Sequence, residues 1–180
     1  QSILPTVLAS LNNKQLQNLS SDQMGSLTAA QVAAFGLDDI KAFSTDQIKA
    51  LGTLQVAAIT KTQIPGFSIS QLSSIESADI SALNAITVAA ITPAQISKLS
   101  TAQISQLNAN QIAAIPITTI DDLTTAQIRG MSSSQISKLT AAQLGALTQD
   151  QIKSLEAAED IAALGSVSYT HLTLPTNREV

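Results

Sequence analysis

One eight-residue pattern repeats without a gap over most of the chain, and it limits the folds that the chain can adopt. Residues 4–155 of the 180 divide into 19 consecutive octads with the consensus [ST]-x-x-Q-[IVL]-x-x-[LIF]. The fifth and eighth positions are apolar in all 19 octads, and glutamine holds the fourth position in 14 of them. A short fixed period of this kind indicates a repeat array in which each unit packs on its neighbours.

Each octad carries the signature of a helix start. Ser or Thr at position 1 and Gln at position 4 form a capping box, in which the hydroxyl accepts from the backbone N–H three residues on and the glutamine accepts from the first N–H. Eleven octads have Ser or Thr at position 1, and Asn12, Asn84 and Asn108 can cap equally well. Pro93 follows Thr92 at the first helical position, where proline is tolerated best. We therefore predict one helix of one to two turns per octad.

Two other folds do not fit the spacing. In one continuous helix the apolar pair would rotate by about 80° per octad, so no single face would be buried. A β-solenoid needs alternation with a period of two, whereas positions 5 and 8 would lie on opposite faces of a strand. Within a short helix, residues three apart share a face. We expect an all-α solenoid, a superhelix of short capped helices with two aliphatic side chains per octad on a common axis.

A slower spacing lies over the octads. The fourth-position glutamine is replaced in the octads that begin at Gly36, Glu76 and Pro116, which are 40 residues apart. This spacing predicts either that five octads make about one superhelical turn or that five octads are one ancestral duplication unit. The octad from Asn84 also lacks the glutamine without fitting the series. Pro65, at the sixth position of its octad, is expected to end its helix early.

The chain is expected to have two parts, a solenoid over residues 4–164 and a tail over residues 165–180. The solenoid comprises the 19 octads to residue 155 and an irregular terminal unit, and Gly165 is expected to cap its last helix.

The tail contains the stretch VSYTHLTLPT at residues 167–176. This stretch resembles, at all ten positions, one translated frame of a transposon adapter used to prepare sequencing libraries; residues 167–180 as a whole fit the adapter and an index. The resemblance implies that the tail is non-native and without ordered structure. We expect the natural protein to continue past Ser166 in a different sequence.

The composition leaves little material for catalysis or metal binding. The chain has no Cys, and its single His171 and single Tyr169 both lie in the tail. The abundant serines therefore lack a base partner for a nucleophilic triad. The only adjacent aspartates are Asp38-Asp39 and Asp121-Asp122. A calcium site needs several oxygen ligands with glycine at defined spacing, so we interpret both pairs as helix first-turn acids on a solvated surface. We predict no enzyme activity, no catalytic, cofactor-binding or metal-binding residue, and no cofactor.

The charges are few and scattered. The net charge is −4, and Arg129 and the lysines occur singly, which is typical of solubilising residues. Nucleic acids and anionic membranes both select clustered Lys and Arg, so we predict no nucleic-acid partner. No apolar run approaches the roughly 18–20 residues of a membrane span. The start, QSILPTVLASL, lacks an initiator Met and a basic region, so we do not interpret it as a signal peptide and expect an internal fragment.

Octads such as TPAQISKL (92–99) and STAQISQL (100–107) resemble the Thr-x-x-Gln-Ile-x-x-Leu arrays of very large secreted or surface proteins of Gram-negative bacteria, of the RTX or adhesin type. The resemblance covers residues 4–164 and does not extend to the Gly/Asp-rich nonapeptides of RTX calcium binding. It implies an extracellular or cell-surface location and a structural role as a spacer or scaffold. The alternative hypothesis is a binding module, in which polar Thr/Gln ladders or the superhelical groove hold a protein or glycan partner.

Overall fold

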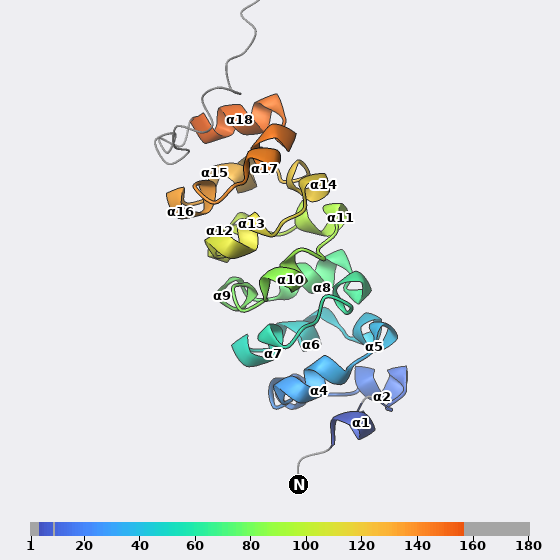
Figure 1. Cartoon of the computed structure of the whole chain (residues 1–180). Helices are drawn as coiled ribbons and strands as arrows, with labels where there is room; N and C mark the ends of the chain where they lie inside the picture. The colour runs from blue at the N-terminus through green and yellow to red at the C-terminus, as the bar shows by residue number, and fades with distance from the viewer. Residues whose placement is uncertain (1–3, 9, 157–180) are drawn as a thin grey trace, which may run out of the picture.

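The computed structural model describes residues 4–8 and 10–156, and within these ranges every regular element is helical. The elements stack along one axis into an elongated body, which Figure 1 shows from the first octads at the bottom to the last at the top. One short helix occupies each octad, in this order: α1 (Pro5–Leu8), α2 (Asn13–Gln17), α3 (Ser21–Gly25), α4 (Ala29–Ala34), α5 (Leu37–Ala42), α6 (Thr45–Lys49), α7 (Thr53–Ala57), η1 (Ile64–Gly66), α8 (Ile69–Ser74), α9 (Ser77–Ile80), α10 (Ala85–Val88), α11 (Pro93–Ile96), α12 (Thr101–Gln106), α13 (Ala109–Ala113), α14 (Ile117–Ile120), α15 (Thr125–Arg129), α16 (Ser133–Ile136), α17 (Ala141–Ala146) and α18 (Gln149–Glu156).

The octad 100–107 illustrates why each helix is so short. Ser100 is extended, with φ −68° and ψ 156°, and its hydroxyl accepts from the N–H of Gln103 at 3.0 Å. The Ser100 N–H in turn donates to Gln103 Oε1 at 2.9 Å, which completes the capping box. At the other end Leu107 is again extended, and its N–H donates to the Ile104 carbonyl at 3.2 Å. The predicted all-helical fold is confirmed. In the octad 100–107, the helix also begins after the predicted capping residue and ends within the octad.

Three octads make one turn of the superhelix. Helices that pack on each other are three octads apart along the chain, as α12 does with α9 below it and with α15 above it. The chain bends at every octad boundary, where the capping residue is extended, and after three bends it returns above its own start. The prediction of about five octads per superhelical turn is therefore wrong, because 24 residues complete a turn. The 40-residue spacing of the glutamine replacements does not follow the turn.

The core is a continuous apolar column on the superhelix axis. The fifth-position side chains of successive octads lie at its centre, and Ile96, Ile104 and Ile112 are fully buried. The eighth-position side chains, such as Leu99 and Leu107, close it at the corners. Every octad contributes one such pair, so the core continues along the body, although the eighth-position Leu11, Leu19 and Leu27 are only partly buried.

The octad with Pro65 departs from the α-helical pattern, but the expected early end is not seen, because its helix runs through Pro65 to Gly66. Its regular element is the 3-10 helix η1, because proline cannot donate the backbone hydrogen bond that would continue an α-helix. A Cβ at Gly66 would lie 2.8 Å from the Leu37 carbonyl oxygen one turn below, so the backbones approach too closely there for a side chain. The expected Gly165 cap and the tail 165–180 lie outside the described residues.

Candidate functional site

The fourth-position glutamines are the most frequently repeated functional group of the chain, and most of them lie inside the fold. From Gln31 to Gln151 each is at most 7% exposed. In every octad that has this glutamine, Oε1 accepts from the N–H of the first residue at 2.6–2.9 Å. This contact is the local half of the capping box and satisfies an N–H that the helix itself cannot pair.

The amide nitrogen of the same side chain donates hydrogen bonds to the turn below. From Gln47 to Gln151, each fourth-position Nε2 donates to the carbonyl oxygen 28 residues earlier and to another that is 30 or 31 residues earlier. Gln127 Nε2, for example, lies 2.8 Å from the Ile96 oxygen and 2.7 Å from the Leu99 oxygen. Carbonyls at a helix C-terminus lack partners within the helix. One side chain therefore caps the start of its own helix and the end of a helix in the previous turn.

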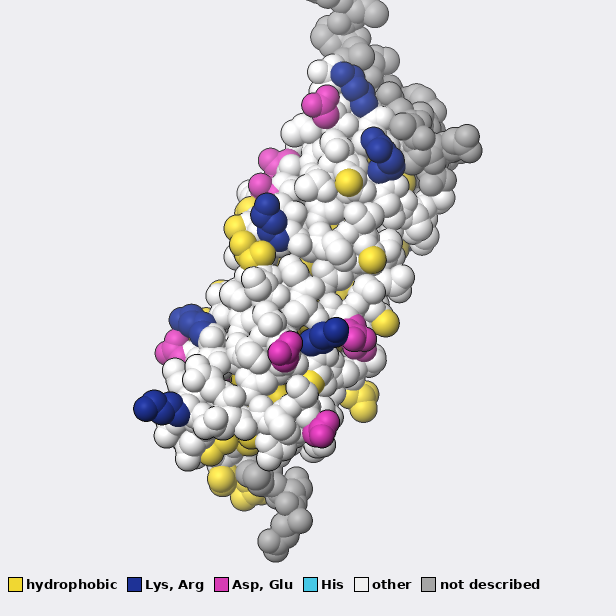
Figure 2. Space-filling model, turned by 180° about the vertical axis from the view of Figure 1, so that it is seen from behind, with side chains coloured by type: hydrophobic (Ala, Val, Ile, Leu, Met, Phe, Trp, Pro, Cys, Tyr) yellow, Lys and Arg dark blue, Asp and Glu magenta, His cyan; other side chains and the backbone are white. Residues whose placement is uncertain are grey.

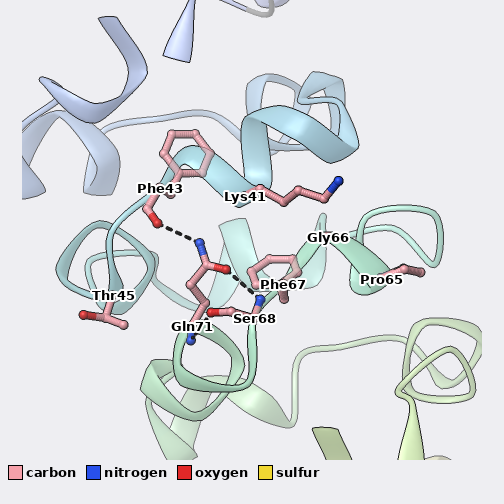
Figure 3. A pocket seen from close by; sticks show the side chains of 8 residues that line it. All are labelled: Lys41, Phe43, Thr45, Pro65, Gly66, Phe67, Ser68 and Gln71. Carbon is pink, nitrogen blue, oxygen red and sulfur yellow. Dashed lines mark hydrogen bonds between the residues drawn. The ribbon is translucent and has the colours of Figure 1, made fainter. Parts of the chain in front are cut away.

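Figure 3 shows this arrangement at Gln71, beside a hollow of about 430 Å³ at the η1 turn. Gln71 accepts from the Ser68 N–H at 2.7 Å and donates to the Phe43 oxygen at 2.7 Å. The Lys41 ammonium at the rim pairs with Asp38 at 2.9 Å. The polar side chains of Lys41, Ser68 and Gln71 at the hollow thus already have partners within the protein. Its lining residues are Lys41, Phe43, Thr45, Pro65, Gly66, Phe67, Ser68 and Gln71.

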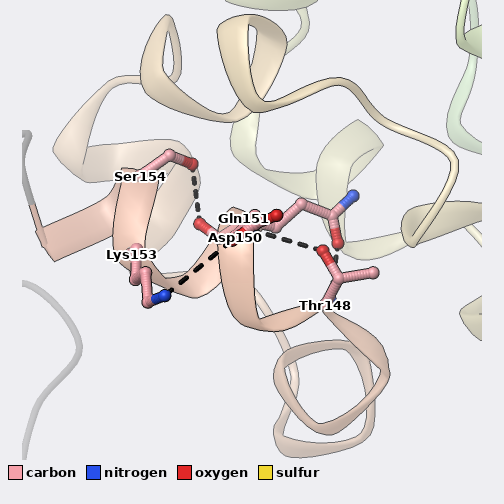
Figure 4. Close-up of polar contacts among 5 residues, drawn as sticks. All are labelled: Thr148, Asp150, Gln151, Lys153 and Ser154. Atoms are coloured by element: carbon pink, nitrogen blue, oxygen red, sulfur yellow. Dashed lines mark hydrogen bonds and ion pairs between the residues drawn. The ribbon is translucent and has the colours of Figure 1, made fainter.

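The same contacts recur in the last described octad (Figure 4). The Thr148 N–H donates to Gln151 Oε1 at 2.7 Å, and Thr148 Oγ1 accepts from the Gln151 N–H at 3.3 Å. Ser154 donates to the Gln151 carbonyl at 2.7 Å, while Lys153 and Asp150 form a long, exposed ion pair at 3.9 Å. The polar residues here are therefore engaged in the helix and its cap.

Four octads between residues 36 and 123 place another residue at the fourth position. Asp39 keeps the local contact, because its carboxylate accepts from the Gly36 N–H at 2.8 Å. Asp79 instead accepts from the hydroxyl of Thr53, one turn below. Thr87 donates to the carbonyl oxygen 28 residues earlier, that of Ile59, at 3.0 Å. Thr119 is buried. None of the four makes the paired donation of a glutamine to the turn below.

The two acid pairs considered as calcium ligands lie far apart in the sequence and are on different octads. Asp38 and Asp39 lie in the first turn of α5, and Asp38 is paired with Lys41. Asp121 and Asp122 are exposed but follow the end of α14, so their interpretation as first-turn acids is wrong. Over the described part of the chain, His, Cys, Asp and Glu residues form no group of three or more that could hold a metal ion. Arg129 is exposed on α15. His171 and Tyr169 lie outside the described residues.

The surface is mostly neutral. Figure 2 shows few Lys, Arg, Asp and Glu side chains on one face of the body, singly or in small groups of mixed sign among uncharged atoms. A few aliphatic side chains are also exposed, among them Leu54 at 80%, Ile86 at 67%, Leu4 at 66% and Ile117 at 53%. Leu54 borders a second open hollow, of about 610 Å³, lined by Gly25, Leu27, Thr28, Ala29, Thr53, Leu54 and Gln55. Within residues 4–8 and 10–156, the helices are all too short to cross a bilayer.

Comparison with known proteins adds a repeat family. Residues 32–68 and 120–157 match the family model described as the ALTTAQ repeat. Read as residues, these letters correspond to positions 7 and 8 of one octad and 1 to 4 of the next, and residues 123–127 read LTTAQ. The chain is thus similar to a known repeat in two separate segments, which supports a repeat array. A comparison with curated proteins found no match.

Sequence reasoning identified the glutamine as half of a capping box and missed its bonds to the turn below. The signal was present in the fourth column. Glutamate serves a capping box as well as glutamine does, yet it occupies the fourth position in none of the 19 octads. A carboxylate accepts but cannot donate, so the preference for glutamine over glutamate in this column indicates that a donor is needed.

Proposed function

We propose that residues 4–164 are a structural segment, a spacer or scaffold, of a large secreted or cell-surface bacterial protein. The observation that carries this proposal is the use of the glutamines. From Gln47 onward, each buried fourth-position glutamine forms hydrogen bonds within the fold through both its amide oxygen and its amide nitrogen. These glutamines therefore cap helices and join successive turns. An array held by contacts between neighbouring units can vary in length while its cross-section stays constant.

Small-angle scattering of the purified chain measures its length and cross-section, and so tests whether the elongated body behaves as a uniform rod. Removing residues 92–115, which is one full turn, should shorten the particle by a fixed step and leave its cross-sectional radius unchanged. Removing the single octad 100–107 is the matched control and should shorten it by about one third of that step. A particle whose cross-section changes with either deletion would rule out a uniform spacer.

The location is tested by recovering the complete reading frame with long-read sequencing across both ends of the source DNA. We expect the repeats to adjoin a secretion signal or adhesin-type modules, and the stretch VSYTHLTLPTNREV to be absent. Repeats that flank a catalytic domain would contradict the proposal, and a gene that ends in this stretch would contradict its interpretation as an adapter.

A second candidate is a binding module for a protein partner, favoured by the exposed Leu54, Ile86 and Ile117. The buried glutamines cannot serve as a ligand-binding ladder, so such a module would use the outer surface. Replacing the three aliphatic residues by Ser in the parent protein separates the two roles. If the variant stays folded but the parent protein loses its function, the binding role is favoured. If the function of the parent protein is unchanged, the spacer role is favoured.

We also propose that the segment has no catalytic activity. The described residues contain neither His nor Cys, and their carboxylates are scattered. A general hydrolase screen on the purified chain tests this, and turnover that survives repurification would overturn it.

A further inference from the structure

We propose that the octads 76–83 and 84–91 form a weak turn, at which the interior of the rod opens most readily. The weak turn follows from the hydrogen bonds alone and is independent of the role of the rod. Its two helices are α9 and α10.

The first observation is that two adjacent octads have fewer hydrogen bonds to the turn below. The side chains of Asp79 and Thr87 each make one such bond, to Thr53 and Ile59, where a glutamine would make two. Between residues 12 and 155, these are the only neighbouring octads that both lack the fourth-position glutamine. A glutamine at position 79 would face the carbonyl oxygens of Ile48 and Leu51, by the spacing seen elsewhere, whereas the Asp79 carboxylate has no proton to donate.

The second observation is that the local capping box is also incomplete in both octads of this turn. The first residue of the octad 76–83 is Glu76, and its side chain makes no capping hydrogen bond. Asn84 accepts from the Thr87 N–H at 2.8 Å, but no fourth-position side chain bonds the Asn84 N–H in return. By contrast, α11, α12 and α13 in the next three octads all have complete capping boxes. Local and inter-turn stabilisation are therefore low at the same place.

The apolar core continues through the weak turn, and this keeps the rod closed in the native state. Ile80, Leu83, Val88 and Ile91 are all buried. In a linear array, opening between two turns disrupts mainly that interface, and regions with fewer contacts open more often. The missing hydrogen bonds therefore raise the frequency of opening without changing the fold.

Native-state hydrogen exchange of the full chain at low urea, read by mass spectrometry, tests the proposal. Peptides from residues 76–91 should exchange at least about tenfold faster than peptides from residues 92–115, because a hydrogen bond contributes roughly a factor of two to ten each. Both segments are interior, so fraying of the ends affects neither. Equal exchange in the two segments at every urea concentration would overturn the proposal.

Restoring the glutamines tests the cause. The double substitution Asp79→Gln and Thr87→Gln should slow exchange over residues 76–91 to the level of residues 92–115. Asp39→Gln is the matched control, since it adds a glutamine to an isolated departure. By the same spacing it would face the carbonyl oxygens of Leu8 and Leu11, so it should leave the 76–91 exchange unchanged. Should the buried Thr87 site not accept a glutamine, Asp79→Gln alone should still slow that exchange severalfold. A folded variant that exchanges as fast as the original chain would show that the hydrogen bonds are not the cause.

Discussion

The octads 20–27 and 100–107 have nearly the same sequence pattern and the same capping box. They differ in the burial of their glutamine and in its hydrogen bonds to the turn below. Ser20 and Gln23 exchange the same two hydrogen bonds as Ser100 and Gln103. Gln23 is nevertheless exposed and donates to no carbonyl in the described residues, whereas Gln103 is 2% exposed and bonds Ile75 one turn below. The helix of an octad is thus set by its own residues, while its burial and its second set of bonds come from the turn on which it stacks.

Truncation of the eighth-position leucines should show the largest difference between the two octads. Leu107 is buried, so Leu107→Ala should lower the free energy of unfolding by about 2–5 kcal/mol through lost contacts and a cavity. Leu27 is only partly buried, and Leu27→Ala should cost about 1–2 kcal/mol. Urea denaturation of both variants measures this, and equal losses would contradict the buried column.

Removal of the glutamine comes next. Gln103→Ala deletes the local cap and leaves the Leu72 and Ile75 oxygens without their side-chain donor, which should cost about 2–4 kcal/mol. Gln23→Ala deletes only the local cap, which should cost about 1 kcal/mol or less. The comparison fails if the two substitutions destabilise the chain to the same extent in urea.

A smaller and sharper test keeps the acceptor and removes only the donor. Gln103→Glu retains an oxygen for the Ser100 N–H but sets a carboxylate against two carbonyl oxygens, which should cost about 1–3 kcal/mol at pH 7. The folded state should raise the pKa of the introduced carboxyl, so it binds its proton more tightly than the unfolded chain does. The cost should therefore shrink as the pH falls through that raised pKa toward 4.

Gln23→Glu is the matched control for the donor test. The introduced carboxylate would be exposed in the first turn of α3, where a negative charge is favourable, so stability should change by less than about 0.5 kcal/mol. Urea midpoints measured from pH 4 to pH 8 follow both variants. An equal pH dependence at the two sites would show that the amide nitrogen of Gln103 has no special partner.

The smallest effects are expected from the surface charges. Asp38→Asn and Asp150→Asn each break an exposed ion pair, at 2.9 Å and 3.9 Å respectively, on different turns. Exposed pairs contribute little, so both should change the free energy of unfolding by less than about 0.5 kcal/mol. A larger loss at either site in urea denaturation would indicate that the charges contribute to the stacking.

The sequence predicted the parts of the fold that depend on neighbours within one octad. The caps at residues such as Ser100 and the buried fifth and eighth positions follow from spacings of three residues. The number of octads per turn depends on the bend at each extended boundary residue, and no local spacing reports that angle. The partners of Gln103 are 28 to 31 residues away, so they become visible only once the turn is known.

The most direct measurement of the central claim is hydrogen exchange of the glutamine side-chain amides by NMR. If Nε2 groups join successive turns, the side-chain N–H protons of Gln103, Gln111 and Gln127 should be strongly protected, while those of Gln15 and Gln23 should exchange at the rate of free amides. Uniformly fast exchange of all five would contradict an array held together by its glutamines.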